Sequence, residues 1–169
     1  SRIDSKPLES SKEKSNKNSS DKQKEKEEIL GKYRKAATIA KEVRESVKPL
    51  VKVGMPLVEL CNRTESMIAE KGGACAFPCN LSINNIAAHY SPPPEDKTLI
   101  QEKDVVKVDY GVHIDGYIAD TAFTVSFDPA YQKLVEAAER GLKVALENMK
   151  AGADTRRIGA LVEVAIREL

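Results

Sequence analysis

Two aspartates, Asp109 and Asp120, lie eleven residues apart in a segment that alternates like a β-hairpin. Apolar side chains recur at every second position of residues 104–127, and the dipeptide Asp115-Gly116 predicts a tight turn between two strands. If the apolar positions of both strands face a core, the two aspartates share the opposite face. Aspartate is disfavoured inside strands, so this pair calls for a chemical explanation.

Two carboxylates on one face of a strand pair either repel each other or share a cation. Directly opposed Cβ atoms lie about 4.5–5.5 Å apart and diagonal ones about 7–8 Å apart. At that range two ionised carboxylates conflict unless one is protonated or a cation lies between them. Asp109 and Asp120 are therefore candidate ligands of divalent metal. The alternative is that one or both point into water, and spacing alone does not exclude it.

The elements that must position this pair follow from periodicity. Apolar residues at three- and four-residue steps, with proline and glycine boundaries, predict helices at residues 33–49, 56–73, 129–152 and 154–169. Residues 75–90 have extended character. Two helices, then strands, then helices predict an α+β fold in which helices cover one face of an antiparallel sheet. The face that carries the aspartates is then left for a cleft.

Several motifs closely resemble those of type 2 methionine aminopeptidases, above all the archaeal branch. They are Ala76-Phe77-Pro78, Asn80 to Asn85, Ala87-Ala88-His89-Tyr90, and the stretches around Asp109 and Asp120. The resemblance runs from about Lys32 to Leu169. It implies the pita-bread fold, of which residues 29–169 would form the first, N-terminal half of a catalytic domain truncated at its C-terminus.

The resemblance also implies an activity and roles for residues. This family removes the initiator methionine from nascent polypeptides with two divalent metal ions, held by two Asp, one His and two Glu. Asp109 and Asp120 match the two Asp ligands. His89 matches a catalytic histidine that contacts the substrate near the scissile peptide, and Phe77 is a candidate wall of the methionine pocket, although a packed aromatic is an equal alternative.

Two further expectations concern metal and completeness. Oxygen-rich sites leave the choice among cobalt, manganese, iron and zinc to geometry and availability, so the sequence does not identify the metal. The remaining His and Glu ligands would follow Leu169. We therefore expect the 169-residue chain alone to be inactive.

Two other functions remain open. A proline-specific peptidase of the same fold is disfavoured by the Ala87-Ala88-His89-Tyr90 motif. The second is a non-catalytic pita-bread relative of the proliferation-associated type, which binds RNA or protein partners. Those relatives lose metal ligands, whereas both aspartates are present here. Basic and acidic residues are equal in number from Ile29 onward, which gives no strong signal for nucleic acid.

Residues 1–28 mix lysine, glutamate and serine with almost no large apolar side chains, which predicts a disordered charged tail, or at most a frayed helix. The tail resembles charged extensions of eukaryotic type 2 enzymes that are associated with ribosomes. Its composition alone favours a solvated tail that keeps the protein soluble. No secretory or membrane-spanning stretch is recognisable, and we expect a cytoplasmic protein without a membrane partner.

The remaining candidate ligands are interpreted as structural. Three cysteines argue against a disulfide framework, and Cys61 lies on an apolar helical stripe. Cys75 and Cys79 have a CxxxC spacing without a second Cys or His pair, which favours structural thiols over zinc. His113 is expected to be a solvent-facing or hydrogen-bonded residue near the hairpin turn.

Overall fold

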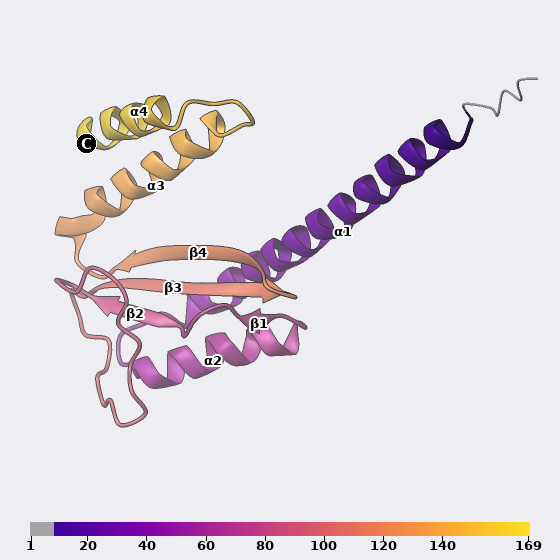
Figure 1. Cartoon of the computed structure of the whole chain (residues 1–169). Coiled ribbons are helices and arrows are strands. Elements are labelled where there is room, and N and C mark those ends of the chain that lie inside the picture. The colour runs from indigo at the N-terminus through magenta and orange to yellow at the C-terminus, as the bar shows by residue number, and fades with distance from the viewer. Residues whose placement is uncertain (1–8) are drawn as a thin grey trace, which may run out of the picture.

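The computed structural model describes residues 9–169, with side chains described from residue 20 onward (Figure 1). The regular elements, joined by short 3-10 helices at Lys48–Leu50 and Pro129–Tyr131, are α1 (Glu9–Val47), α2 (Leu57–Glu70), β1 (Ala74–Cys75), β2 (Asn80–Ile83), β3 (Val105–Ile114), β4 (Tyr117–Ser126), α3 (Gln132–Asn148) and α4 (Thr155–Arg167). Helices and strands occur in the predicted order.

Strand β3 is the centre of an antiparallel sheet. β4 pairs with it along its whole length, and β1 and β2 pair with separate parts of its other edge. The β3–β4 turn consists of Asp115 and Gly116, whose φ angles of 51° and 87° are both positive. Such angles match the twist of a two-residue hairpin and suit Asp-Gly. The predicted hairpin and its turn are confirmed.

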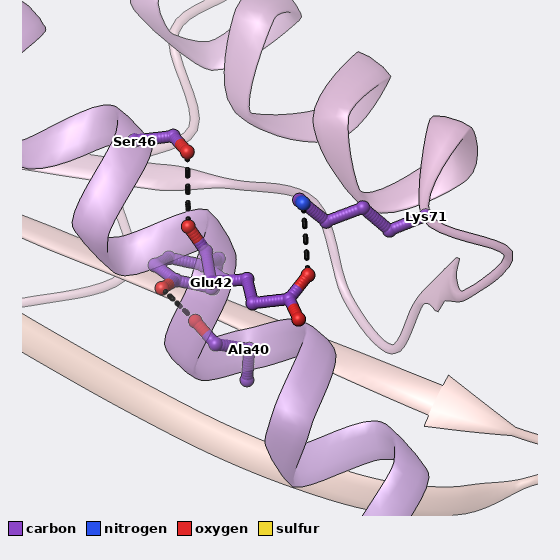
Figure 2. A network of polar contacts seen from close by, with 5 residues as sticks. Ala40, Glu42, Ser46 and Lys71 are labelled. Atoms are coloured by element: carbon purple, nitrogen blue, oxygen red, sulfur yellow. Dashed lines mark hydrogen bonds and ion pairs between the residues drawn. The ribbon is translucent and has the colours of Figure 1, made fainter.

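The apolar face of the sheet packs against α1 and α2: α1 contacts both hairpin strands, and α2 contacts β1 and β2 (Figure 1). Val106, Val108 and Val112 are fully buried there. The Tyr110 hydroxyl donates to the Ala40 carbonyl of α1 at 2.8 Å. An ion pair links the two helices: Lys71, directly after α2, donates to Glu42 of α1 at 2.8 Å (Figure 2). Helices α1 and α2 therefore cover one face of the sheet, as predicted.

Helix α1 begins well before the expected boundary. Residues 9–28 are helical, where the sequence predicts disorder or at most a frayed helix, and residues 1–8 of that tail lie outside the described part. The physical reason is continuity with the packed half of the helix. Once packing fixes residues 36–47 as a helix, extending that helix towards the N-terminus avoids the unfavourable step of helix nucleation. Lysine, glutamate and glutamine also favour helix, and Lys32 pairs with Glu28 at 3.2 Å.

Helices α3 and α4 form a hairpin and pack chiefly on each other (Figure 1). Asp128 and Asp154 accept backbone N–H groups at the starts of Pro129–Tyr131 and α4, as the sequence predicts. Gly141 allows close contact, since a Cβ there would lie 3.1 Å from Ile166 Cδ1. The outer apolar side chains of α3, and that of Met149 directly after it, are largely exposed to solvent: Leu134, Leu142, Leu146 and Met149.

The segment 75–90 is less extended than its sequence predicts. Only Ala74–Cys75 and Asn80–Ile83 are strands. Asn84 and His89 adopt positive φ angles of 51° and 62°, which end the strand and form a loop. In the described part of the chain, no helix combines the length and apolar character that a bilayer span requires.

Candidate metal centre

Asp109 and Asp120 lie on the same face of the β3–β4 hairpin. Asp109 is opposite Ala122 and Asp120 is opposite Gly111, so the two aspartates are diagonal neighbours. Opposed residues of an antiparallel pair point to the same side of the sheet, and diagonal Cβ atoms lie about 7–8 Å apart. The predicted common face is confirmed. Their role as ligands remains a prediction.

Neither carboxylate is neutralised by a basic side chain among the described residues. Lys107 is the nearest lysine along β3, on the same face, but its Nζ donates to the Asn84 carbonyl at 2.8 Å. Burial lowers the pKa of Lys107. Asp109 is half-buried and Asp120 is exposed. The two carboxylates thus face a common region without a cationic side chain of the described residues between them.

A divalent cation fits this pair, because carboxylate oxygens are its usual ligands and the negative charges are otherwise uncompensated. The pair does not complete a coordination shell. Within residues 20–169, no group of three or more His, Cys, Asp or Glu side chains is arranged to hold a metal. Asp109 and Asp120 therefore offer part of a metal centre, and further ligands are needed to close it.

Phe77 lies over the same face of the sheet. A Cβ atom placed on Gly111 would be only 2.5 Å from Phe77 Cε1 and 2.9 Å from Ala76 Cβ. The Ala76 N–H donates to the Gly111 carbonyl at 2.9 Å, which fixes this approach. Since Gly111 is the register partner of Asp120, the ring forms an apolar wall beside the carboxylates. This position suits the predicted role of Phe77.

His89 lies in the loop beyond β2, on the side of that strand away from β3. Its neighbour Tyr90 accepts the Leu81 N–H at 2.7 Å, so the loop runs along the outer edge of β2. A cavity of about 310 Å³ next to Asp109 is lined by Ala87 and Ala88, but His89 itself does not line it. His89 is exposed, with a left-handed backbone that is uncommon for a residue with a Cβ. The structure thus brings its loop to the site.

Asn84 organises this loop, a role that no sequence pattern predicted. Its Nδ2 donates to Asp104 Oδ1 at 2.9 Å, and its Oδ1 accepts the Val105 N–H at 2.8 Å. Its carbonyl accepts Lys107, as described above. An asparagine at the end of a short strand is a weak signal for a left-handed turn residue, but its partners lie about twenty positions away in sequence.

The three cysteines are free and lie close to one another. The Cys61 thiol donates to the Cys79 carbonyl at 3.3 Å. Contact with the Cys61 thiol, together with burial, raises the pKa of the Cys79 thiol, and burial raises that of Cys75. Neutral thiols are poor metal ligands and poor nucleophiles. His113 accepts the Gly116 N–H through Nδ1 at 3.0 Å, which confirms it as a hydrogen-bonded turn residue.

A carboxylate pair on one face of a helix-backed antiparallel sheet, beside an aromatic ring and a cavity that α3 also lines, is a candidate metal centre in an α+β protein. The chain belongs to metallopeptidase family M24, which it matches over residues 31–169. This family assignment agrees with the resemblance that the motifs carry. It places Asp109, Asp120, His89 and Phe77 within the matched region.

Individual relatives agree with the family. The chain is 47% identical over 133 residues to a methionine aminopeptidase of Pyrococcus horikoshii, covering 79% of this chain and 45% of the relative. It is 44% identical over 141 residues to that of Saccharolobus solfataricus, covering 83% and 47%. The chain thus spans about half the length of these curated relatives.

Solved structures agree on the fold. The methionine aminopeptidase of Rickettsia prowazekii superposes with a TM-score of 0.75 at 21% identity, covering 84% of this chain and 60% of that one. The architecture is that of the pita-bread fold, as the sequence motifs imply.

Proposed function

We propose that this chain contributes to a type 2 methionine aminopeptidase, which removes the N-terminal methionine from nascent polypeptides in the cytoplasm by metal-dependent hydrolysis. The observation that supports this most directly is the diagonal pair Asp109 and Asp120, which shares one sheet face without a basic partner among the described residues. Membership of metallopeptidase family M24 and archaeal relatives named methionine aminopeptidase support the same conclusion.

Asp109 and Asp120 would hold two divalent ions together with ligands from outside residues 20–169. When bound, such ions polarise a peptide carbonyl and lower the pKa of a water molecule towards neutrality. Cobalt, manganese, iron and zinc all remain candidates. The protein contributes two anionic ligands on a rigid hairpin, whose strands hold the carboxylates at fixed spacing.

The other two residues would act on the substrate. His89, in the loop beside the Asp109 cavity, would hydrogen-bond the peptide near the bond that breaks. Phe77, over Gly111, would contact the apolar methionine side chain and exclude water from it. The contact of Phe77 with Gly111 supports its assignment, and the loop residues Ala87 and Ala88 in the cavity beside Asp109 support that of His89.

Association with ribosomes is proposed for the N-terminal part of α1. Residues 20–28 are all exposed and carry both charges, so this half of the helix is free for a partner surface. The substrate emerges from ribosomes, which makes such a partner reasonable. Deletion of residues 1–28 should lower co-sedimentation with ribosomes while leaving peptide hydrolysis by the complete enzyme unchanged. Equal co-sedimentation would reject this part of the proposal.

The metal assignment is tested with three isosteric variants: Asp109→Asn, Asp120→Asn and Asp115→Asn. Each removes one carboxylate from the same hairpin, but Asp115 lies at its turn and pairs with Lys32 at 3.2 Å. In calorimetric titrations of this chain with Mn²⁺, we expect weak binding that the first two variants abolish and the third retains. Equal loss in all three variants would show that binding follows net charge.

Catalysis is tested on a full-length protein, meaning a chain that spans the whole length of the methionine aminopeptidase relatives. We expect it to release methionine from a Met-Ala-Ser peptide in a metal-dependent manner, and the Asp109 and Asp120 variants to lose this activity. The 169-residue chain alone should show no release. Full-length activity that survives either substitution would reject the ligand assignment, and a metal-binding but inactive parent would favour a non-catalytic relative.

A further inference from the structure

Strand β2 places an amide directly beside one of the two carboxylates. Asn80 is the register partner of Asp109 across the β2–β3 pairing, so both side chains point to the same face of the sheet. Asn80 Nδ2 donates to Asp109 Oδ2 at 3.4 Å, and both residues are half-buried. Asp109 therefore has one oxygen engaged by a neutral donor.

The backbone around Asn80 is fixed on both sides. The preceding N–H, that of Cys79, donates to Glu65 Oε1 at 2.9 Å. The following N–H, that of Leu81, donates to the Tyr90 carbonyl at 2.7 Å. Because the backbone of Asn80 is already fixed, its side-chain amide loses little further conformational entropy when it bonds to Asp109. It can therefore hold the Asp109 carboxylate in one orientation.

The neutrality of the donor matters at a cation site. A lysine in this place would orient Asp109 but would also cancel the charge that attracts a metal. The one lysine next to it on β3, Lys107, is held by the Asn84 carbonyl instead. Asn80 thus orients the carboxylate and leaves its negative charge available.

Asp120 has no comparable support among the described residues. It lies on β4, which pairs with β3 on one side, and its carboxylate is exposed without a hydrogen bond from the described side chains. The two carboxylates therefore differ, since one is oriented in advance and the other is free to adjust. Groups that orient metal ligands typically change metal affinity by about 10–100-fold when they are removed.

We propose that Asn80 is a positioning residue for the metal ligand Asp109, and that its amide keeps one carboxylate oxygen occupied so that the other is presented to the cation. This inference rests on the proposed metal centre. It adds a residue whose side chain would touch neither metal nor substrate. Asn80 acts only through Asp109.

The first test compares the Mn²⁺ affinity of Asn80→Ala with that of Asn62→Ala. Asn62 is an exposed asparagine on α2, so its variant controls for loss of an amide as such. We expect Asn80→Ala to bind Mn²⁺ about 10-fold more weakly than the unmodified chain, and Asn62→Ala to bind it equally well. The metal-free melting temperature of both variants checks that they remain folded. Equal affinity of Asn80→Ala and the unmodified chain would overturn the proposal.

The second test needs no metal and separates this inference from the proposed function. The side-chain amide protons of Asn80 are followed by NMR in the unmodified chain and in Asp109→Asn, which replaces the charged acceptor. We expect a marked shift of these resonances and faster exchange with water in the variant. Unchanged resonances would overturn the contact, even where Mn²⁺ binds. A shift in a chain that fails to bind Mn²⁺ would support the contact and reject the metal centre instead.

Discussion

The ring of Phe77 lies directly on the backbone of Gly111, in space that a Cβ atom would otherwise occupy. The clearance of 2.5 Å between an ideal Cβ and Phe77 Cε1 is shorter than side chains tolerate. Gly111 is thus required for its lack of a side chain, since its φ angle is not in the left-handed region. The contact places an aromatic wall next to Asp120, the register partner of Gly111.

Gly111→Ala should therefore destabilise the chain. We expect the free energy of unfolding to fall by about 1–3 kcal/mol, because the added methyl group forces the Phe77 ring or the Ala76 backbone to move. Gly159→Ala is the matched control. It adds the same methyl group in helix α4, where nothing lies within 4 Å of the ideal Cβ, and it should stabilise by about 0.5–1 kcal/mol.

A double-mutant cycle with Phe77→Ala identifies the partner. The cost of Gly111→Ala should largely disappear when Phe77 is already alanine, with a coupling of about 0.5–3 kcal/mol in urea denaturation. Additive effects would show that the methyl group clashes elsewhere.

The buried phenol of Tyr110 should make stability depend on pH in the alkaline range. Its side chain is 1% exposed, and burial raises the pKa of Tyr110 to about 12. In the unfolded chain the phenol ionises at about pH 10. The folded state keeps the proton longer, so this stabilisation is complete below pH 10 and is lost as pH rises from about 10 to about 12.

Tyr110→Phe is the variant that isolates this effect. At neutral pH its free energy of unfolding should be about 1 kcal/mol lower than that of the unmodified chain, because no hydroxyl donates to the Ala40 carbonyl. Between about pH 10 and 12 the unmodified chain should lose its advantage over the variant. Urea titrations of both proteins at several pH values measure the difference. A constant difference at all pH values would contradict the perturbed phenol.

Asn84 should be essential for the shape of the loop that carries His89. Asn84→Gly keeps the positive φ angle but removes two side-chain hydrogen bonds, and should cost about 1–3 kcal/mol. Asn84→Asp should lower the free energy of unfolding more at neutral pH than at pH 4, since it places a second carboxylate against that of Asp104. Asn85→Asp, at the exposed next position, is the control. If Asn84→Asp unfolds at the same urea concentration at both pH values, the Asp104 contact is not present.

The local order of the fold could be predicted from the sequence because its signals are short-range. Alternation in residues 104–127 and the Asp-Gly turn determine the hairpin register, and register alone puts Asp109 and Asp120 on one face. Proline, glycine and aspartate mark the helix ends in the same way. These features depend on neighbours within a few residues.

Other features depend on distant partners and could not be predicted. The fit of Phe77 on Gly111, the amide of Asn80 beside Asp109 and the partners of Asn84 each join residues about twenty to thirty-four positions apart in sequence. No periodicity encodes such pairs. The length of α1 before Ile29 could not be predicted for a related reason, since a composition that cannot form a core can still extend a helix anchored elsewhere.

The backbone of His89 offers a last test, which separates its structural cost from its proposed role. At φ = 62° a residue with a Cβ is strained by about 1–2 kcal/mol, whereas glycine is not. His89→Gly and His89→Ala both remove the imidazole, so we expect the glycine variant to be about 1 kcal/mol more stable than the alanine variant in urea denaturation. In the full-length protein, both variants should lose methionine release equally. Equal stability of the two variants would show that the backbone is not held in the left-handed region. Retained activity in the glycine variant would mean that the loop, and not the imidazole, matters at this position, since strain of this kind persists where a side chain must be held in place.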